Sequence, residues 1–546
     1  MRFIILFFLL CLTFSAARSE EKPLNVLLIC VDDLKPLLGC YGDPVAKTPA
    51  MDELASRGLL FESAYCNQAV CSPSRNSLMT GLRPQTIGIY DLPTNFRKTV
   101  PDAVTVAQHF QSHGYRTEAL GKIMHKGHGN VEDAVSWTIP HFLAKAPTYV
   151  SPESTANGRM DSRGRKRGAA TEMADVADET YADGLIAKEA VNRLAKAAAK
   201  PDEPFFIAVG FIRPHLPFVA PSKYWDLYDP DKLPMPEFTE APEGAPSYGP
   251  HSGGELRQYS DIPAKDEIDE TLTRELIHGY YAATSYADAQ VGRLIEALDS
   301  NGLSGNTIIV LWGDHGWHLG DHSIWCKHTN YEQAARIPLI VVAPGGAKNA
   351  RSGAFIETVD LYPTLAELAG LPGPKRLDGV SQAAVIADPE TAVRDHVIHV
   401  YPRGGRLGRA IRTERYRMVE WKVPGSSVDT AEFELYDYVA DPLETKNLAS
   451  SEGERLNELR EILATHPEAK PQYRVVTPEQ LAKKKAAIEK RVRAFKTRDE
   501  DGDGRLTLEE FLIKQPDPEE APKRFPVFDR NGDGSLSEDE YVNAGK

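Results

Sequence analysis

Residues 24–33 read LNVLLICVDD, a largely apolar run that ends in two aspartates. Residues 205–211, 307–312 and 337–343 form three more short runs of this kind. Short runs that are apolar throughout are typical of strands buried on both faces of a sheet. We therefore predict a buried sheet whose first strand carries charged side chains at its carboxyl end.

Amphipathic segments lie between these runs, at residues 51–57, 104–113, 181–199 and 275–298. Their apolar residues recur at helical spacing, which predicts helices. Strands that alternate with helices favour an α/β fold with a parallel or mostly parallel central sheet. Ligands bind beyond the carboxyl ends of the strands in such sheets, so a site is expected just past those ends.

Three of the four predicted strands are followed by side chains that can bind metal or carry protons. Asp32 and Asp33 follow the first strand, His215 follows the second, and Asp314 and His315 follow the third. Three carboxylates make an oxygen-rich site suited to a hard cation, with Ca²⁺ favoured and Mg²⁺ second. An imidazole is a softer ligand, which leaves the contact made by His315 open.

The pattern changes after the fourth strand. Residues 20–397 are predicted to form one α/β domain, whereas short alternating segments over 398–470 predict a smaller antiparallel subdomain. A linker with prolines and charges follows, and residues 478–546 form a separate tail.

Composition restricts the class of protein. The chain has 546 residues, 42% of them hydrophobic, and a formal net charge of −15. That charge argues against a general nucleic-acid binder or a membrane-surface protein, so an anionic substrate must be bound by local positive charge. Cysteines are few, and Cys30, Cys40, Cys66 and Cys326 could pair in three ways or stay free. The sequence gives no oligomeric state.

The first residues resemble a targeting segment. Arg2 precedes an apolar run over residues 3–12, and small residues follow it, which predicts a secretory signal peptide over residues 1–19. The run is shorter than the roughly 20 apolar residues that a spanning helix needs, and no later segment is long enough. We therefore predict a secreted or periplasmic protein without a membrane span.

The tail contains two acidic loops, at residues 499–510 and 529–540. Each fits the twelve-residue EF-hand pattern, with glycine at the sixth position and glutamate at the twelfth. The predicted Ca²⁺ ligands, with the seventh residue acting through its carbonyl, are Asp499, Asp501, Asp503, Arg505, Thr507 and Glu510, and Asp529, Asn531, Asp533, Ser535, Ser537 and Glu540. An all-α EF-hand pair with two Ca²⁺ ions is therefore expected.

Residues 71–81 carry the most specific signal, because they fit the pattern C-x-P-x-R-x-x-x-x-T-G. This pattern, and the segment GYRTEALGK at 114–122, resemble the two signatures of the formylglycine-dependent sulfatase family. The resemblance implies an alkaline-phosphatase-like fold and an enzyme that hydrolyses sulfate esters. It also implies that a formylglycine-generating enzyme oxidises Cys71 to formylglycine.

Within that family, residues 32–43, 68–75, 210–218 and 314–327 are similar to segments of the iduronate-2-sulfatases. A sulfated saccharide is the implied substrate, with a 2-O-sulfated uronate as the leading candidate. The implied metal ligands are Asp32, Asp33, Cys71, Asp314 and His315. The implied catalytic residues are Cys71, Arg75, Lys122, His125, His215 and Lys327.

Each implied role suits the chemistry of its side chain. Sulfate-ester cleavage needs a nucleophile at sulfur, positive charge on the sulfate oxygens and a proton for the leaving oxygen. Lys122 and Lys327 would bind the sulfate, His215 would protonate the leaving oxygen and His125 would act as base. Arg75 would orient the segment that carries the nucleophile.

Trp317 and His328 are weaker candidates for contact with substrate. His328 stands where iduronate-2-sulfatases have a tyrosine that helps to hold the sugar carboxylate, so the uronate assignment is less secure. Two other functions stay open from the sequence: a phosphonate or phosphate ester hydrolase of the alkaline-phosphatase superfamily, and a non-catalytic carbohydrate-binding or docking protein that uses the EF-hands.

Overall fold

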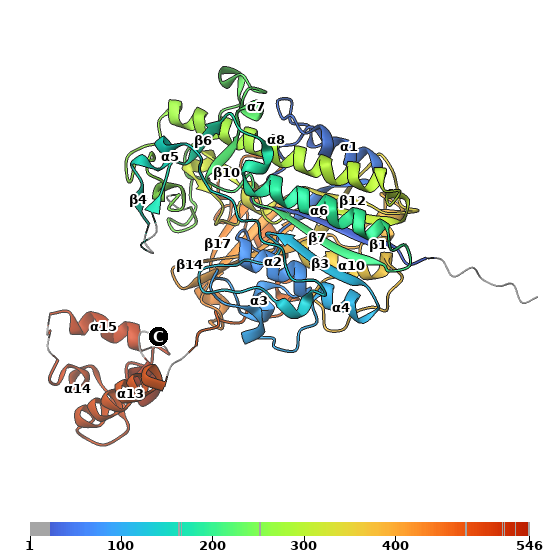
Figure 1. Ribbon diagram of the computed structural model, residues 1–546. Coiled ribbons are helices and arrows are strands. Elements are labelled where there is room, and N and C mark those ends of the chain that lie inside the picture. Colours follow the sequence, from blue (N-terminus) through green and yellow to red (C-terminus); the bar gives the residue numbers. More distant parts are fainter. Residues whose placement is uncertain are drawn as a thin grey trace, which may run out of the picture. The chain divides into compact units, whose positions relative to one another are not determined.

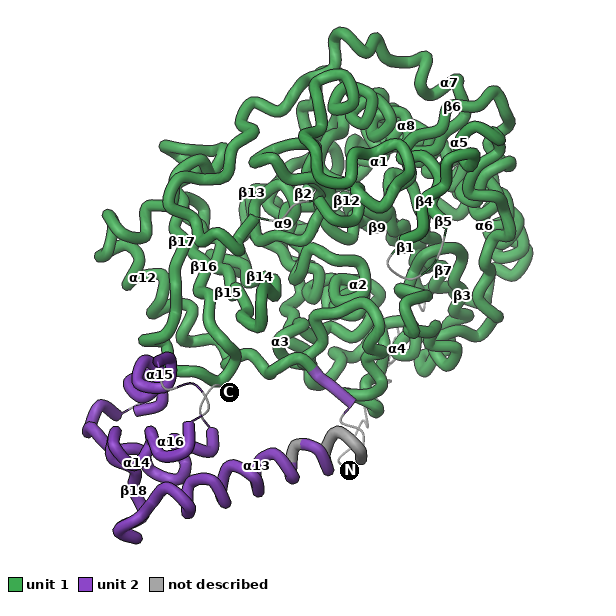
Figure 2. The backbone as a smooth tube through the Cα atoms, turned by 90° about the vertical axis from the view of Figure 1, so that its left-hand side faces the viewer, with its two compact units in different colours: residues 1–472 green, residues 473–546 purple. Residues whose placement is uncertain are grey.

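The computed structural model describes residues 22–543 except 162, 163, 165, 251, 252, 476, 477, 516, 518 and 530. The predicted signal peptide therefore lies outside the described residues. Two compact units are present, one ending at Gln472 and the other beginning at Tyr473 (Figure 2). Over the described residues, no helix combines the length and apolar character that crossing a membrane requires.

A seven-stranded sheet forms the centre of the first unit, in the order β13-β2-β12-β9-β1-β7-β3. Its strands are β1 (Asn25–Val31), β2 (Leu59–Tyr65), β3 (Arg116–Gly121), β7 (Phe205–Phe211), β9 (Thr307–Gly313), β12 (Leu339–Val342) and β13 (Ala350–Glu357). β1 runs parallel to both β7 and β9, and β7 runs parallel to β3. The predicted α/β fold with a mostly parallel sheet is confirmed.

One of the predicted strands runs against the others. β12 is antiparallel to both of its neighbours, β9 and β2. An apolar run shows that a strand is buried but carries no signal for its direction, so the sequence did not reveal this reversal.

Helices cover both faces of this sheet (Figure 1). One face packs against α1 (Pro49–Arg57), α6 (Ala182–Ala198) and α8 (Glu270–Ser300), and the other against α2 (Cys71–Thr80), α4 (Val106–Ser112) and α10 (Leu361–Leu368). Side chains of β1 alternate between the two cores: Leu27 and Ile29 belong to the first, and Val26 and Leu28 to the second. Burial of each such side chain contributes roughly 1.5–3 kcal/mol, which fixes the strand that carries the first two aspartates.

A four-stranded antiparallel sheet follows, made of β14 (His396–Arg403), β15 (Arg406–Thr413), β16 (Tyr416–Lys422) and β17 (Glu432–Asp437). Gly404 and Gly405 connect β14 to β15 and both have positive φ, of 53° and 87°, as a two-residue type I′ hairpin requires. The helix α12 (Gly453–Ala464) packs on this sheet through its leucines. The smaller antiparallel subdomain is therefore present as predicted.

The second unit is mainly helical. It contains α13 (Pro478–Arg498), α14 (Leu508–Leu512), α15 (Ala521–Phe528) and α16 (Glu538–Asn543), with the two-residue strands β18 (Arg505–Leu506) and β19 (Leu536–Ser537). Leu506 pairs with Leu536, and Phe495, Phe511 and Phe525 form the core around this pair. Each acidic loop contains one of the paired strands, since β18 lies within residues 499–510 and β19 within residues 529–540, as in an EF-hand pair.

Candidate active site

The strand ends bring the predicted polar residues to one edge of the sheet. Asp32 and Asp33 directly follow β1, Asp314 and His315 follow β9, and Lys122 follows β3. The amide of Asp33 donates to Oδ1 of Asp314 at 2.9 Å, which ties the ends of the two neighbouring strands together. Both pairs of residues are fully buried.

Cys71 is the first residue of α2 and faces this cluster. Its Sγ lies 3.4 Å from Nε2 of His315, 3.7 Å from Nζ of Lys122 and 4.0 Å from Oδ1 of Asp33. The residue before it is extended, and Pro73 lies within the first turn of the helix, where a proline removes no helical hydrogen bond. Burial opposes ionisation of the thiol, but the ammonium groups of Lys122 and Lys327 outweigh it and hold the pKa of Cys71 well below its usual value.

The end of α2 explains the last residue of the motif. Gly81 has φ of +66° and its amide donates to the carbonyl of Ser77, which closes the helix in the left-handed conformation. A Cβ at this position would lie 2.8 Å from the side chain of Leu377. The positive φ is therefore the main reason for glycine at this position, and a larger residue would also displace the side chain of Leu377.

Arg75 lies on the same helix and is completely buried. Its guanidinium donates to Oδ1 of Asp32 at 2.9 Å, to Oδ2 of Asp314 at 3.0 Å and to the carbonyl of Ile123 at 3.1 Å, and it also donates to the carbonyl of Lys122. These bonds orient two carboxylates: the second oxygen of Asp32 contacts Lys122, and that of Asp314 accepts from the amides of Asp33 and His315.

Donor atoms of Asp32, Asp33, Cys71 and His315 all lie within 4.8 Å of one another. Asp314 Oδ1 lies 3.7 Å from Nε2 of His315, at the side of this group. Burial disfavours a charged imidazole, yet the carboxylates of Asp314 and Asp33 raise the pKa of His315 to about 10. The cluster thus attracts positive charge strongly, and its oxygen-rich donor set fits a hard divalent cation.

Two lysines reach the same carboxylates from the open side. The ammonium of Lys122 contacts Oδ2 of Asp32, and Nζ of Lys327 lies 3.0 and 3.1 Å from the oxygens of Asp33. Both ammonium groups are therefore next to Cys71, where they can meet an anionic group.

Two histidines stand beside the nucleophile position. Nδ1 of His215 lies 2.6 Å from the carbonyl of Leu216, so it must donate and the ring is fixed with Nε2 toward the carboxylates, 3.9 Å from Asp33. Burial disfavours its charged form, but Asp33 raises the pKa of His215 above its usual value. His125 is half-buried, with Nε2 2.9 Å from Nδ1 of His128 and with Nδ1 buried and unpartnered among the described residues.

The two weaker candidates take different positions. Trp317 is fully buried, stacks on Tyr280 and lies with its ring 4.9 Å from Nζ of Lys327. Its side chain has no exposed surface and lies against Lys327, and a contact of Trp317 with substrate stays a prediction. His328 has 24% of its side chain exposed and follows Lys327 directly.

The tail loops have the internal hydrogen bonds of EF-hands. Oxygens of Asp499, Asp501 and Glu510 lie within 4.8 Å of one another. The amide of Gly504 donates to Asp499 at 3.1 Å, and the equivalent bond in the second loop, from Gly534 to Asp529, is 2.9 Å.

Other predicted ligands lie in the same two loops. Thr507 and Ser537 donate through their hydroxyls to the glutamates that end the loops. Asn531 and Ser535 both donate to Asp533, and the guanidinium of Arg505 also reaches Asp533, at 2.8 Å. Asp503 accepts from the amide of Arg505 at 2.7 Å.

Comparisons with known proteins agree with this geometry. Residues 24–371 match the sulfatase family, and residues 320–467 match the C-terminal region of N-sulphoglucosamine sulphohydrolase. The chain belongs to the sulfatase family. Residues 492–512 and 523–543 of this sulfatase match the EF hand. The family establishes a sulfuric ester hydrolase and sets aside the non-catalytic alternative.

Curated relatives support the same family. The human iduronate 2-sulfatase is 36% identical over 394 residues, which cover 66% of this chain and 71% of that protein. A sulfatase of Formosa agariphila is 29% identical over 461 residues, covering 80% of this chain and 84% of that one.

Solved structures show the alkaline-phosphatase-like sulfatase fold. One, in complex with D-glucosamine-2-N,6-O-disulfate, has a TM-score of 0.64 at 21% identity and covers 81% of this sulfatase and 97% of that chain. The phosphonate monoester hydrolase of Agrobacterium radiobacter has a TM-score of 0.66 at 23% identity, and the match covers 84% of this sulfatase and 98% of that chain.

Sequence reasoning missed one residue of this sulfatase site, Glu255. Its carboxylate lies 3.1 Å from Nζ of Lys327 and 3.5 Å from Nε2 of His215. Burial raises its pKa, but Lys327, His215 and His328 together lower it to about 2. Glu255 lies in an irregular segment just before a short 3-10 helix and belongs to no motif, so no local signal identified it.

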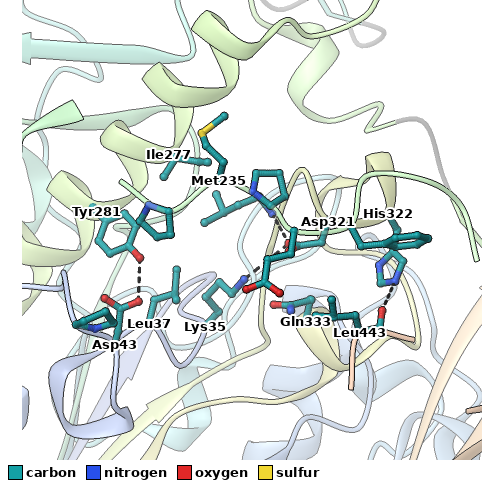
Figure 3. Close-up of a pocket in the computed structure, with 16 residues that line it drawn as sticks. Lys35, Leu37, Asp43, Met235, Ile277, Tyr281, Asp321, His322, Gln333 and Leu443 are labelled. Carbon is teal, nitrogen blue, oxygen red and sulfur yellow. Dashed lines mark hydrogen bonds and ion pairs between the residues drawn. The ribbon is translucent and has the colours of Figure 1, made fainter. Parts of the chain in front are cut away.

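A separate cavity of about 290 Å³ lies away from this site (Figure 3). Two polar pairs line it. Nζ of Lys35 lies 3.9 Å from Oδ2 of Asp321, and the hydroxyl of Tyr281 donates to Oδ2 of Asp43 at 2.9 Å. None of the predicted catalytic residues lines it. Tyr280, which accepts from the amide of Lys35 and donates to the carbonyl of Asp33, connects the segment beside the cavity to the active site.

The five cysteines among the described residues, including Cys30, Cys40, Cys66 and Cys326, are free. The pairing that the sequence left open is therefore absent from this part of the chain. Burial raises the pKa of the thiols of Cys66 and Cys326 well above the usual value, in contrast to Cys71.

Proposed function

We propose that this sulfatase hydrolyses a sulfate ester of a sulfated saccharide through a formylglycine formed from Cys71. The observation that carries the proposal is the position of Cys71, between a buried carboxylate cluster and the ammonium groups of Lys122 and Lys327. A 2-O-sulfated uronate is the leading substrate, supported by the 36% identity to iduronate 2-sulfatase.

Residues around position 71 fit the needs of that reaction. The hydrate of the converted residue supplies the oxygen that attacks sulfur. Lys122 and Lys327 bind the non-bridging sulfate oxygens and offset the charge that develops on them. A cation held by Asp32, Asp33, Asp314, His315 and residue 71, Ca²⁺ or Mg²⁺, would acidify that oxygen and add positive charge to the pocket.

Proton transfers fall to the two histidines. His215, whose Nδ1 donates to a backbone carbonyl, directs Nε2 into the pocket and donates a proton to the leaving sugar oxygen as the bond to sulfur breaks. His125 has a buried Nδ1 without a hydrogen-bond partner among the described residues, and it would take the proton of the second hydroxyl of the hydrate, so that the aldehyde forms again as the bond between its carbon and the sulfate oxygen breaks. Arg75 keeps both carboxylates in place throughout.

Three further parts belong to the same proposal. Residues 1–19 direct the protein to secretion or to a periplasm, and a formylglycine-generating enzyme oxidises Cys71. Both tail loops bind Ca²⁺, which stabilises the tail.

Hydrolysis of phosphonate or phosphate esters is the second candidate, because a phosphonate monoester hydrolase shares this fold. Paired turnover of an aryl sulfate, an aryl phosphate and a phosphonate monoester separates the two. We expect faster sulfate release, loss of activity in Cys71→Ala and full activity in the control Cys40→Ser, because Cys40 lies outside the site. Faster phosphate or phosphonate cleavage would reverse the assignment.

A further inference from the structure

Glu255 is a carboxylate beside Lys327, the lysine predicted to bind sulfate. Its oxygens lie 3.1 and 3.3 Å from Nζ of Lys327, 3.5 Å from Nε2 of His215 and 3.9 Å from Nε2 of His328. Its side chain is 21% exposed, whereas the metal-binding carboxylates have no exposed surface. Glu255 can therefore contact a molecule that enters the pocket.

The charge of Glu255 needs an explanation, because a carboxylate here repels the anionic group that the lysines bind. Lys327 already has a carboxylate partner in Asp33, at 3.0 Å. A carboxylate offers about four acceptor sites and Lys327 occupies at most one on each oxygen, so Glu255 can also accept from a donor on the substrate.

The position of the leaving oxygen limits which donor Glu255 can reach. In the proposed function His215 protonates that oxygen, which places it within about 3.2 Å of Nε2. Nε2 lies 3.5 Å from Glu255, so the leaving oxygen is within about 7 Å of the carboxylate. On a pyranose ring, the groups closest to the leaving oxygen are the substituents of the two neighbouring carbons.

We propose that Glu255 accepts a hydrogen bond from a free hydroxyl on the carbon next to the sulfated one. It thereby selects saccharides with that hydroxyl and disfavours those with a second sulfate there. This inference rests on the proposed function and specifies its substrate class: a sugar sulfate with an unmodified neighbouring hydroxyl.

The test uses the full-length enzyme and three saccharides that differ at one carbon: a monosulfate with the neighbouring hydroxyl, its deoxy analogue and its vicinal disulfate. An aryl sulfate is the reference substrate. The variants are Glu255→Gln, which keeps size but removes charge, and Glu255→Ala. Glu179→Gln is the matched control, since Glu179 pairs with Arg293 at 2.9 Å outside the catalytic cluster.

We expect the wild type to favour the hydroxyl over the deoxy sugar by about 10- to 150-fold in kcat/KM, as a hydrogen bond to a charged group gives. Glu255→Ala should bring this ratio close to one. Glu255→Gln should raise kcat/KM on the vicinal disulfate, relative to kcat/KM on the monosulfate, by about tenfold or more. The control should leave both ratios unchanged.

If both variants lose kcat/KM by the same factor on all four substrates, the inference is overturned, because Glu255 would then act only as a structural partner of Lys327. Unchanged ratios would overturn it as well. Wild-type turnover of the saccharides tests the proposed function by itself, so its failure and the failure of the Glu255 inference give different results.

Discussion

Acid should weaken the junction between β14 and the loop that carries Lys327, because His399 is buried there as a neutral imidazole. His399 is 2% exposed, and its Nδ1 lies 3.1 Å from Oδ1 of Asn330. Burial and the positive charge of Arg417 lower the pKa of His399 from 6.5 to about 3.

The sign of the effect follows from this shift. Below pH 6.5 the unfolded chain binds a proton at His399 that the folded chain does not accept until about pH 3, so stability is lost as the pH falls through this range. At about 1.4 kcal/mol per pH unit, lowering the pH from 8 to 4.5 should cost about 3 kcal/mol of unfolding free energy at this one residue.

Urea unfolding at pH 8 and pH 4.5, followed by tryptophan fluorescence at constant Ca²⁺, measures this loss of unfolding free energy. His399→Gln keeps an amide that can donate to Asn330 and cannot titrate. It should therefore lose about 3 kcal/mol less than the wild type between the two pH values. His113→Gln, at the exposed end of α4, is the control for removal of a histidine. An equal loss in His399→Gln and the wild type would refute the reasoning.

Two further changes test the active site and the tail. Arg75→Lys keeps the charge but loses the planar fork that bonds two carboxylates and two backbone carbonyls together, so it should lower the unfolding free energy by about 2–4 kcal/mol and strongly reduce turnover, both measured at constant Ca²⁺; unchanged stability would contradict the role of the guanidinium. Asp503→Ala combined with Asp533→Ala should weaken Ca²⁺ binding by the tail in calorimetry with little loss of turnover; a large loss would show that tail and catalysis are coupled.

Much of the site was predictable because it follows from strand ends. The runs before Asp32 and Asp314 are largely apolar, so strands of a mostly parallel sheet with a site beyond their carboxyl ends could be expected. The structure pairs these two strands directly. Cys71 and Arg75 were found through their spacing in one helix, and the structure gives the reason: one faces the cluster and the other holds it from behind.

What the sequence did not reveal depends on contacts between distant segments. Glu255 enters the site from an irregular segment and meets Lys327, 72 residues away, so no local pattern marks it. Trp317 lies close to the metal-binding residues in sequence, but packing against Tyr280 buries it completely. The reversed direction of β12 likewise follows from pairing on both sides and not from its apolar residues.

The central claim is that Cys71 becomes the nucleophile of a sulfatase. Its most direct test is the mass of the proteolytic peptide that contains residue 71, after expression with a formylglycine-generating enzyme. We expect the thiol CH₂SH to be replaced by an aldehyde CHO at this residue, with the mass change of that exchange, and the modified fraction to follow the rate of sulfate release. An unmodified thiol in enzyme that fully retains sulfate-ester hydrolysis would contradict it.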